Sequence, residues 1–230
     1  MIILSCGEKN QPIENIETEN LTQHQIDSIL MDFNFDYNNP IFIDSTKQVL
    51  LPITTQFQES RKLISKDSYY SDNYPRYWNI LFYNSETGET NLLTESKMRI
   101  SDFDVNLRNV GQILSKSILY KIRNDDFNKD HKLNSYDPLY LFISDNRGKE
   151  LIQISPKNEN LISYSIIPES DELIFRTKRD SNKNLEFDRE DDLIWYKINL
   201  KLNYKPIEIV DSIKRKKIKN LYFEQWLRKK

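Results

Sequence analysis

The chain has 230 residues and a formal net charge of −2, a length that fits one domain with a core or a few repeated units flanked by helices. Hydrophobic residues make up 38% and aromatic residues 12% of the sequence, which suits half-buried β-strands and argues against disorder. A single cysteine excludes an internal disulfide and disfavours a cysteine-based zinc site.

That cysteine, Cys6, follows a short apolar run and a small residue in the sequence MIILSC. This order resembles the end of a bacterial lipoprotein signal, in which the cysteine is lipidated and becomes the mature N-terminus. The resemblance implies a lipid anchor at Cys6, a tether over residues 1–20 and an extracytoplasmic location at the bacterial envelope, in the periplasm or at the outer membrane. A full signal has roughly 7–15 apolar residues, whereas five residues precede Cys6. The alternative is an ordinary small residue in a frayed terminus.

A helix is predicted over residues 22–33. Thr22 and Gln25 form a capping box, and Leu21 pairs with Ile26 as a hydrophobic staple. Apolar residues then recur at helical spacing as far as Phe33. We expect this helix to serve packing.

From residue 41 to residue 211 the sequence changes to short runs of β-branched and aromatic residues separated by Asn, Asp, Ser, Gly and Pro. Eleven such runs predict an all-β, antiparallel core. The predicted strands cover residues 41–43, 49–53, 78–83, 91–94, 118–122, 139–143, 151–154, 161–167, 173–177, 193–198 and 207–210.

Parts of this region repeat. Residues 137–142 (DPLYLF) align without gaps with residues 191–196 (DDLIWY), and residues 77–88 align with the region from 139 to 148. Segments 81–94 and 141–152 resemble the outer hairpin of a β-propeller blade of the TolB or WD-repeat kind, with Gly88 and Gly148 at the turns. The resemblance implies about three propeller-like repeats over residues 75–211. Closed propellers have at least about four blades, so a partial propeller, an open curved sheet and a sandwich all remain open.

A second helix is predicted over residues 212–230, because Ile218, Leu221, Tyr222 and Trp226 follow helical offsets. The last twenty residues carry eight Lys or Arg against two acids, so the rest of the chain carries about −8. We expect the helix to dock on the sheet with a solvated basic face. Contact with anionic lipid headgroups or an acidic protein is the alternative. Residues 21–230 are expected to form one β-rich domain.

Two segments, 126–137 and 180–191, share one pattern of oxygen-bearing side chains. Both place such a side chain at positions 1, 3, 5, 9 and 12, with an apolar residue at position 8. Calcium takes six to eight oxygen ligands at about 2.3–2.6 Å, and alternate side chains of a tight loop point inward together. The predicted ligands are the side chains of Asp126, Asn128, Asp130, Asn134, Asp137, Asp180, Asn182, Asn184, Asp188 and Asp191, with the backbone carbonyls of Lys132 and Glu186 at position 7.

These loops resemble the calcium loops of EF-hands, dockerins and integrin-type propellers. They depart from them at position 6, where His131 and Leu185 replace the usual Gly, and at position 12, where Asp replaces a longer Glu. A positive φ at Leu185 would be strained. Strand-like flanks place the loops in β-hairpins, which disfavours an EF-hand sensor. The alternative is that Asp and Asn supply turn chemistry alone.

The sequence offers little for catalysis. Neither His24 nor His131 has an evident nucleophile partner, and neither a Gly-x-Ser-x-Gly elbow nor a phosphate-binding glycine loop is present. A basic tail on an acidic body without a motif also argues against nucleic-acid binding.

We therefore expect a non-enzymatic, calcium-binding envelope lipoprotein that binds or scaffolds a protein or a glycan. An inhibitor or immunity-type partner of a secreted enzyme is the alternative, and a hydrolase using the pairs Asp125/Asp126 or Asp191/Asp192 is a weaker one. The expected contact surface is the aromatic group Tyr69, Tyr70, Tyr74, Tyr77 and Trp78.

Overall fold

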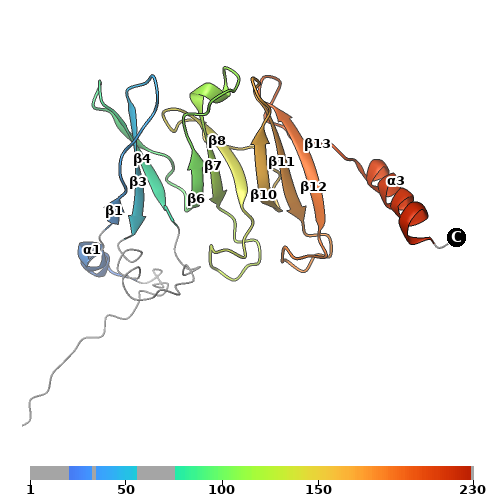
Figure 1. Ribbon diagram of the computed structural model, residues 1–230. Helices are drawn as coiled ribbons and strands as arrows, with labels where there is room; N and C mark the ends of the chain where they lie inside the picture. The colour runs from blue at the N-terminus through green and yellow to red at the C-terminus, as the bar shows by residue number, and fades with distance from the viewer. Residues whose placement is uncertain (1–20, 33–34, 56–75, 229–230) are drawn as a thin grey trace, which may run out of the picture. The chain divides into compact units, whose positions relative to one another are not determined.

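The computed structural model describes residues 21–32, 35–55 and 76–228 (Figure 1). The chain divides into two compact units, Met1–Asn34 and Phe35–Lys230. The first contains helix α1 (Gln23–Asp32). Its start carries the predicted capping box: the Thr22 amide donates to Oε1 of Gln25 at 2.9 Å, and the Gln25 amide donates to Oγ1 of Thr22 at 3.4 Å. This box satisfies backbone donors that a helix start otherwise leaves unpaired.

The second unit contains three antiparallel sheets that follow one another along the chain. Sheet 1 consists of β1 (Phe35–Tyr37), β2 (Ile41–Phe42), β3 (Gln48–Thr55), β4 (Asn79–Asn84) and β5 (Thr90–Leu92). Sheet 2 consists of β6 (Arg99–Asp104), β7 (Ser117–Arg123), β8 (Tyr140–Asp145) and β9 (Ile152–Gln153). Sheet 3 consists of β10 (Glu159–Ile166), β11 (Glu172–Arg179), β12 (Asp192–Asn199) and β13 (Ile207–Glu208).

The strands of each sheet pair mainly with their neighbours along the chain. Sheets 2 and 3 run in chain order, β6-β7-β8-β9 and β10-β11-β12-β13. In sheet 1, β1 and β2 both pair with β3, which pairs with β4, which pairs with β5. Short connections join neighbouring antiparallel strands, so this order needs no crossover.

The three sheets also place buried aromatic residues at matching points of their central strand pairs. Phe82 of β4 lies opposite Leu50, Phe142 of β8 opposite Tyr120, and Tyr196 of β12 opposite Phe175. All six side chains are buried.

Two hydrophobic clusters join the sheets. The first packs sheet 1 against one face of sheet 2 and includes Phe82, Ile100 and Tyr120. The second packs the other face of sheet 2 against sheet 3 and includes Leu141 and Phe175. Sheet 2 is therefore buried on both faces, which explains why β7 and β8 are almost continuously buried.

The prediction of a mostly β, antiparallel fold with two helices is confirmed, and each of the eleven predicted strands coincides with a strand of the structure. Within the described residues the sheets do not close into a barrel. Strands β1 and β6 were not predicted. The sequence of β6, RISDFD, interrupts its apolar residues with acids, and pairing with β7 compensates because Lys121 Nζ lies 3.0 Å from Asp102 Oδ2.

The predicted C-terminal helix is present as α3 (Ser212–Tyr222), which continues into the π-helical turn η3 (Phe223–Leu227). Asp211 caps its start by accepting the Lys214 amide at 2.8 Å. The expectation that this helix docks on the sheet is wrong for the described residues. From 212 to 228 every residue is exposed except Arg215, which is half-buried.

The predicted aromatic contact surface also needs correction. Tyr77 is buried in the cluster between sheets 1 and 2, and its ring meets that of Phe103 edge-on at 5.6 Å. Trp78 is half-buried and packs against Phe35. Tyr69, Tyr70 and Tyr74 lie outside the described residues.

Candidate calcium-binding loops

The two acidic loops occupy equivalent places in their sheets. Residues 126–137 connect β7 to β8 and residues 180–191 connect β11 to β12, the second and third strands of sheets 2 and 3. Figure 1 shows both loops at the same end of the sheets. The corresponding connection of sheet 1, between β3 and β4, lies mostly outside the described residues.

Position 1 holds the turn of each loop in the same way. In the first loop, Asp126 accepts the amides of Asp130 and His131 at 3.1 and 2.9 Å. In the second loop, Asp180 accepts the amides of residues 184 and 185 at 3.2 and 3.1 Å. Each carboxylate thus holds the amides of positions 5 and 6 with one oxygen apiece, and each oxygen keeps a further lone pair.

Positions 3 and 5 repeat this equivalence. The amide oxygens of Asn128 and Asn182 accept the position 5 amide at 3.1 and 3.0 Å. The side chains of Asp130 and Asn184 accept the position 7 amide, from Lys132 and Glu186, at 2.8 and 2.9 Å.

Positions 5 and 9 exchange residue types between the loops while keeping their contact. In the first loop, Asn134 Nδ2 donates to Asp130 Oδ2 at 3.1 Å. In the second loop, Asn184 Nδ2 donates to Asp188 Oδ2, also at 3.1 Å. Each loop therefore keeps one amide and one carboxylate at this pair of positions. The donating amide is at position 9 in the first loop and at position 5 in the second.

Position 12 closes each loop from a buried site. Asp137 is 1% exposed and accepts the amides of Phe127 and Asn134 at 2.9 and 2.8 Å. Asp191 is 7% exposed and accepts the amides of residues 181 and 188 at 2.8 and 3.0 Å. The short Asp thus reaches two backbone donors across the base of the loop.

The electrostatics of the first loop are unfavourable for bare carboxylates. Burial raises the pKa of Asp137, two backbone N–H donors oppose that shift, and the negative charges of Asp126 and Asp130 add to it. The more exposed Asp130 has a pKa below its usual range, chiefly because its carboxylate accepts the Lys132 amide. A bound cation would relieve the repulsion felt at Asp137.

The backbone bends in the left-handed region at the same two positions of each loop. Positions 4 and 6 have positive φ, at 61° for Lys129 and 63° for His131 in the first loop, and at 63° for Lys183 and 64° for Leu185 in the second. Leu185 therefore adopts the positive φ that its side chain disfavours. Residues other than Gly, Asn and Asp rarely adopt this conformation because it crowds Cβ.

In each loop the predicted side-chain oxygens accept hydrogen bonds from the loop's own backbone amides. Hard oxygen donors of this kind, three of them carboxylates in each loop, fit a calcium ion by their chemistry. Among the described residues, no three His, Cys, Asp or Glu side chains converge as a metal-binding group. Besides their carboxylates, the predicted sites include Asn side chains and the backbone carbonyls of position 7.

Sequence reasoning missed that the two loops touch. The ring of Phe127, at position 2 of the first loop, stacks on that of Phe187, at position 8 of the second. An aromatic residue in each of two mainly polar loops was the available signal. Their pairing depends on how sheets 2 and 3 pack.

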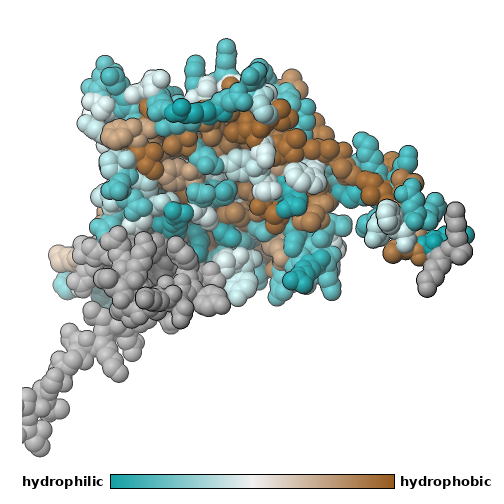
Figure 2. Space-filling model, in the orientation of Figure 1, coloured by the Kyte–Doolittle hydropathy of each residue, from teal (hydrophilic) through white to brown (hydrophobic). Residues whose placement is uncertain are grey.

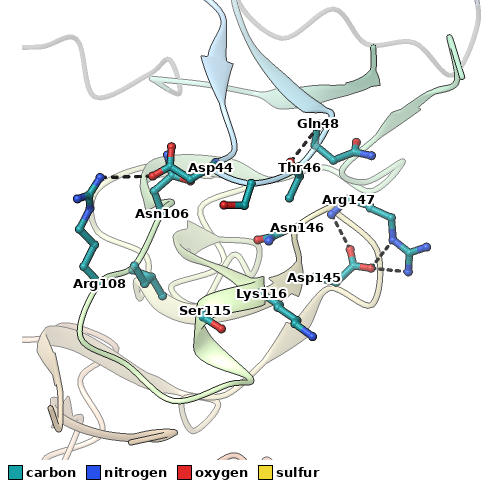
Figure 3. A pocket seen from close by; sticks show the side chains of 12 residues that line it. Asp44, Thr46, Gln48, Asn106, Arg108, Ser115, Lys116, Asp145, Asn146 and Arg147 are labelled. Carbon is teal, nitrogen blue, oxygen red and sulfur yellow. Dashed lines mark hydrogen bonds and ion pairs between the residues drawn. The ribbon is translucent and has the colours of Figure 1, made fainter. Parts of the chain in front are cut away.

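A polar cavity of about 870 Å³ lies at the other end of sheets 1 and 2 (Figure 3). The β2–β3 turn, the segment before β7 and the β8–β9 turn form its walls. Its two carboxylates already have partners, since Asp44 lies 3.4 Å from Arg108 and Asp145 lies 2.7 Å from Arg147. Lys116 and Asn146 also line the cavity and leave donors for a ligand. The sequence carried no signal for this site, because its residues come from three separate turns.

The chain matches no model of a known protein family, and no curated protein sequence is similar to it. Among the described residues, no helix combines the length and apolar character needed to cross a membrane. Cys6 lies outside the described residues.

Proposed function

We propose that this protein is a calcium-binding, lipid-anchored module of the bacterial envelope that binds a protein or a glycan and performs no catalysis. The observation that carries the calcium assignment is the duplicated loop. The two loops share their hydrogen bonds at positions 1, 3, 5, 9 and 12 although three of the predicted ligand positions, 5, 7 and 9, carry different residues. The exchange at positions 5 and 9 keeps three carboxylates and two amide oxygens in each loop, a set of hard oxygen donors that calcium accepts.

The role proposed for calcium is structural. The first loop has carboxylates at positions 1, 5 and 12, and the second at positions 1, 9 and 12. Neutralising these charges would stabilise the long β7–β8 and β11–β12 connections. With Asp at position 12, we expect the modest affinity typical of extracellular modules, with a dissociation constant of about 0.1–1 mM.

The three sheets are proposed to be propeller-like repeats. Each is an antiparallel meander with a buried residue pair at the same central point, and consecutive sheets pack face to face. In this arrangement the acidic loops stiffen one end of the repeats. The polar cavity at the other end provides amide, hydroxyl and cationic groups suited to a polar ligand such as a glycan.

Thermal unfolding of the chelated protein, with and without about 2 mM calcium, tests the metal sites. For a dissociation constant of about 0.1 mM, mass action adds about 2 kcal/mol per site. Two sites should raise the melting temperature by roughly 5–10 °C. Magnesium should raise it less, because it demands a smaller octahedral site.

A double variant, Asp126→Ala with Asp180→Ala, should lose the calcium-induced shift. The matched control is Asp125→Ala with Asp192→Ala, which removes the same charge from exposed residues just outside the loops. Calcium titration by calorimetry should give two sites in the parent and in the control. An equal calcium response in the parent and the loop variant would overturn the assignment.

The lipid anchor needs a separate test. Metabolic labelling with a radioactive fatty acid should label the protein expressed in a bacterial host, and Cys6→Ala should abolish the label. Equal labelling of the parent and the variant would remove Cys6 as the anchor.

A further inference from the structure

Helix α3 combines exposed apolar side chains with a dense set of cations. Ile213, Ile218 and Trp226 are 78%, 57% and 75% exposed, and Leu221, Tyr222, Phe223 and Leu227 are all at least 43% exposed. Residues 212–228 contain six Lys or Arg and one acid, Glu224. Figure 2 shows hydrophilic and hydrophobic side chains together on this helix. Single exposed apolar residues are ordinary on a protein surface, whereas a cluster of this kind marks an interaction site.

An ion pair ties the first turn of the helix to sheet 3, because Arg215 Nη1 lies 3.3 Å from Oε2 of Glu208 in β13. Asp211 caps the helix start. The other cations, Lys214, Lys216, Lys217, Lys219 and Arg228, have no ion-pair partner among the described residues. Isolated helices of this length are marginal in water, so a surface that covers its apolar residues would stabilise it.

The arrangement along the helix fits the interface of an anionic bilayer. Ile218, Leu221 and Tyr222 lie at positions i, i+3 and i+4 and so share a face, which Trp226 extends. The free lysines precede or flank that face. Trp and Tyr suit the headgroup level because an apolar ring there carries a polar group, and lysines reach past it to lipid phosphates.

We infer that α3 and η3 form a second membrane contact, which lies in the interface of an anionic lipid bilayer and adds to any lipid anchor. Charge complementarity identifies the occupant: the helix is strongly cationic while the rest of the chain is acidic, so the helix alone is drawn to an anionic surface. A single acyl chain gives only marginal membrane binding, and stable attachment takes a second signal such as a polybasic segment. This inference does not depend on calcium binding.

Vesicle flotation of the full, unlipidated chain in chelator tests the inference. The protein should float with vesicles of phosphatidylcholine mixed with phosphatidylglycerol and stay in solution with phosphatidylcholine alone. Binding should fall with added salt, because exposed charges are screened. The fluorescence of Trp226 should shift to the blue on binding, and Trp226→Phe should lose most of the shift while still floating.

Charge and apolar variants separate the two parts of the surface. Lys216→Glu with Lys217→Glu should weaken vesicle binding at least roughly tenfold, since each basic residue near the surface contributes about 1 kcal/mol. Leu221→Ser with Phe223→Ser should weaken it by a similar factor. The matched charge control is Lys149→Glu with Lys157→Glu, both exposed and outside the helix, which should bind nearly as the parent does.

All altered residues are exposed, so we expect the variants to keep the parent's melting temperature. An unchanged melting temperature shows that a variant is folded. Failure of the parent to float with anionic vesicles would overturn the inference, as would equal binding by the helix variants. Capture of polyglutamate without vesicle binding would overturn it too and point to an acidic protein.

Discussion

The rings of Phe127 and Phe187 stack with their centroids 5.1 Å apart and their planes at 28°. This contact joins the acidic loop of sheet 2 to that of sheet 3, at the same end of the two sheets. Both side chains are half-buried although both loops are mainly polar. A conformational change in one loop would therefore affect the other through this direct contact.

Separating the two rings should both destabilise the protein and uncouple the loops. Stacked aromatic pairs contribute about 0.5–1.5 kcal/mol beyond the area that they bury. A double-mutant cycle with Phe127→Ala, Phe187→Ala and their combination should give a coupling free energy in this range, measured by chemical denaturation. Calcium titration of Phe187→Ala should also show less cooperative binding than the parent. Additive single effects would show that the stacking contributes nothing.

The packing of sheet 1 on sheet 2 depends on a glycine. Gly148 is buried, has φ +72°, and a Cβ at this position would lie 2.2 Å from Cε2 of Phe82. We expect Gly148→Ala to cost about 3 kcal/mol in the free energy of unfolding, through backbone strain and overpacking against a core ring.

Gly88→Ala is the matched control for this prediction. Gly88 also has a positive φ, +76°, but its Cβ would have no atom within 4 Å. It should therefore cost only about 1 kcal/mol, the backbone term alone. Equal losses in the two variants, measured by urea denaturation, would contradict the role of Phe82.

Strand positions could be predicted because local residue types determine them. Runs such as residues 193–198 are rich in β-branched and aromatic residues, and pairing within a sheet of neighbouring strands keeps such segments extended. The hydrogen-bonding residues of the loops could be predicted for a similar reason, since each loop is a continuous segment in which spacing alone decides which side chains meet.

Contacts between separate segments could not be predicted. The Phe127–Phe187 stack and the polar cavity both depend on how the sheets pack, which the alternation of residues within one strand does not specify. Helix α3 shows the same limit: its spacing predicts a helix with an apolar face, but the same face suits a sheet, a membrane or a partner.

The positive φ of Leu185 should be a source of strain that a single substitution relieves. A residue of this kind in the left-handed region costs about 1–3 kcal/mol, and glycine adopts it freely. The Leu185 side chain is 39% exposed, so its removal also gives up the covered part of its surface, which offsets part of this gain. We expect Leu185→Gly to raise the free energy of unfolding by about 0.5–1 kcal/mol in chelator.

Leu185→Ala is the control for this substitution, because it removes the same side chain but keeps Cβ and its strain. It should be neutral or slightly destabilising. Should Ala stabilise the protein as much as Gly does, the effect would come from loss of an exposed apolar side chain and not from the backbone. Both variants are measured by thermal and chemical unfolding.

Beside the second acidic loop, Arg179 holds two carboxylates at the end of sheet 3. Its Nε lies 2.7 Å from Glu159 Oε1 and its Nη2 lies 2.8 Å from Glu208 Oε1. Glu159 is buried, and Tyr196 and Thr177 donate their hydroxyls to it. Loss of the guanidinium would leave the Glu159 carboxylate buried without a cation, so Arg179→Met should cost roughly 3 kcal/mol at neutral pH.

The ion pair between Arg179 and Glu208 should make the free energy of unfolding decrease at acid pH. The hydrogen bond from Arg179 lowers the pKa of Glu208 below its usual range. Because the pKa is lower in the folded state, the stabilisation from Glu208 is fully present above the unfolded pKa of about 4.3 and is lost as pH falls through the folded value. In Arg179→Met the Glu208 pKa should return toward its usual value, and stability should fall less steeply below about pH 5. Arg189→Met removes the same charge from an exposed loop residue and should keep the parent's dependence of unfolding free energy on pH. Urea denaturation across acid pH measures this dependence. The same dependence in all three proteins would rule out the ion pair between Arg179 and Glu208 as its cause.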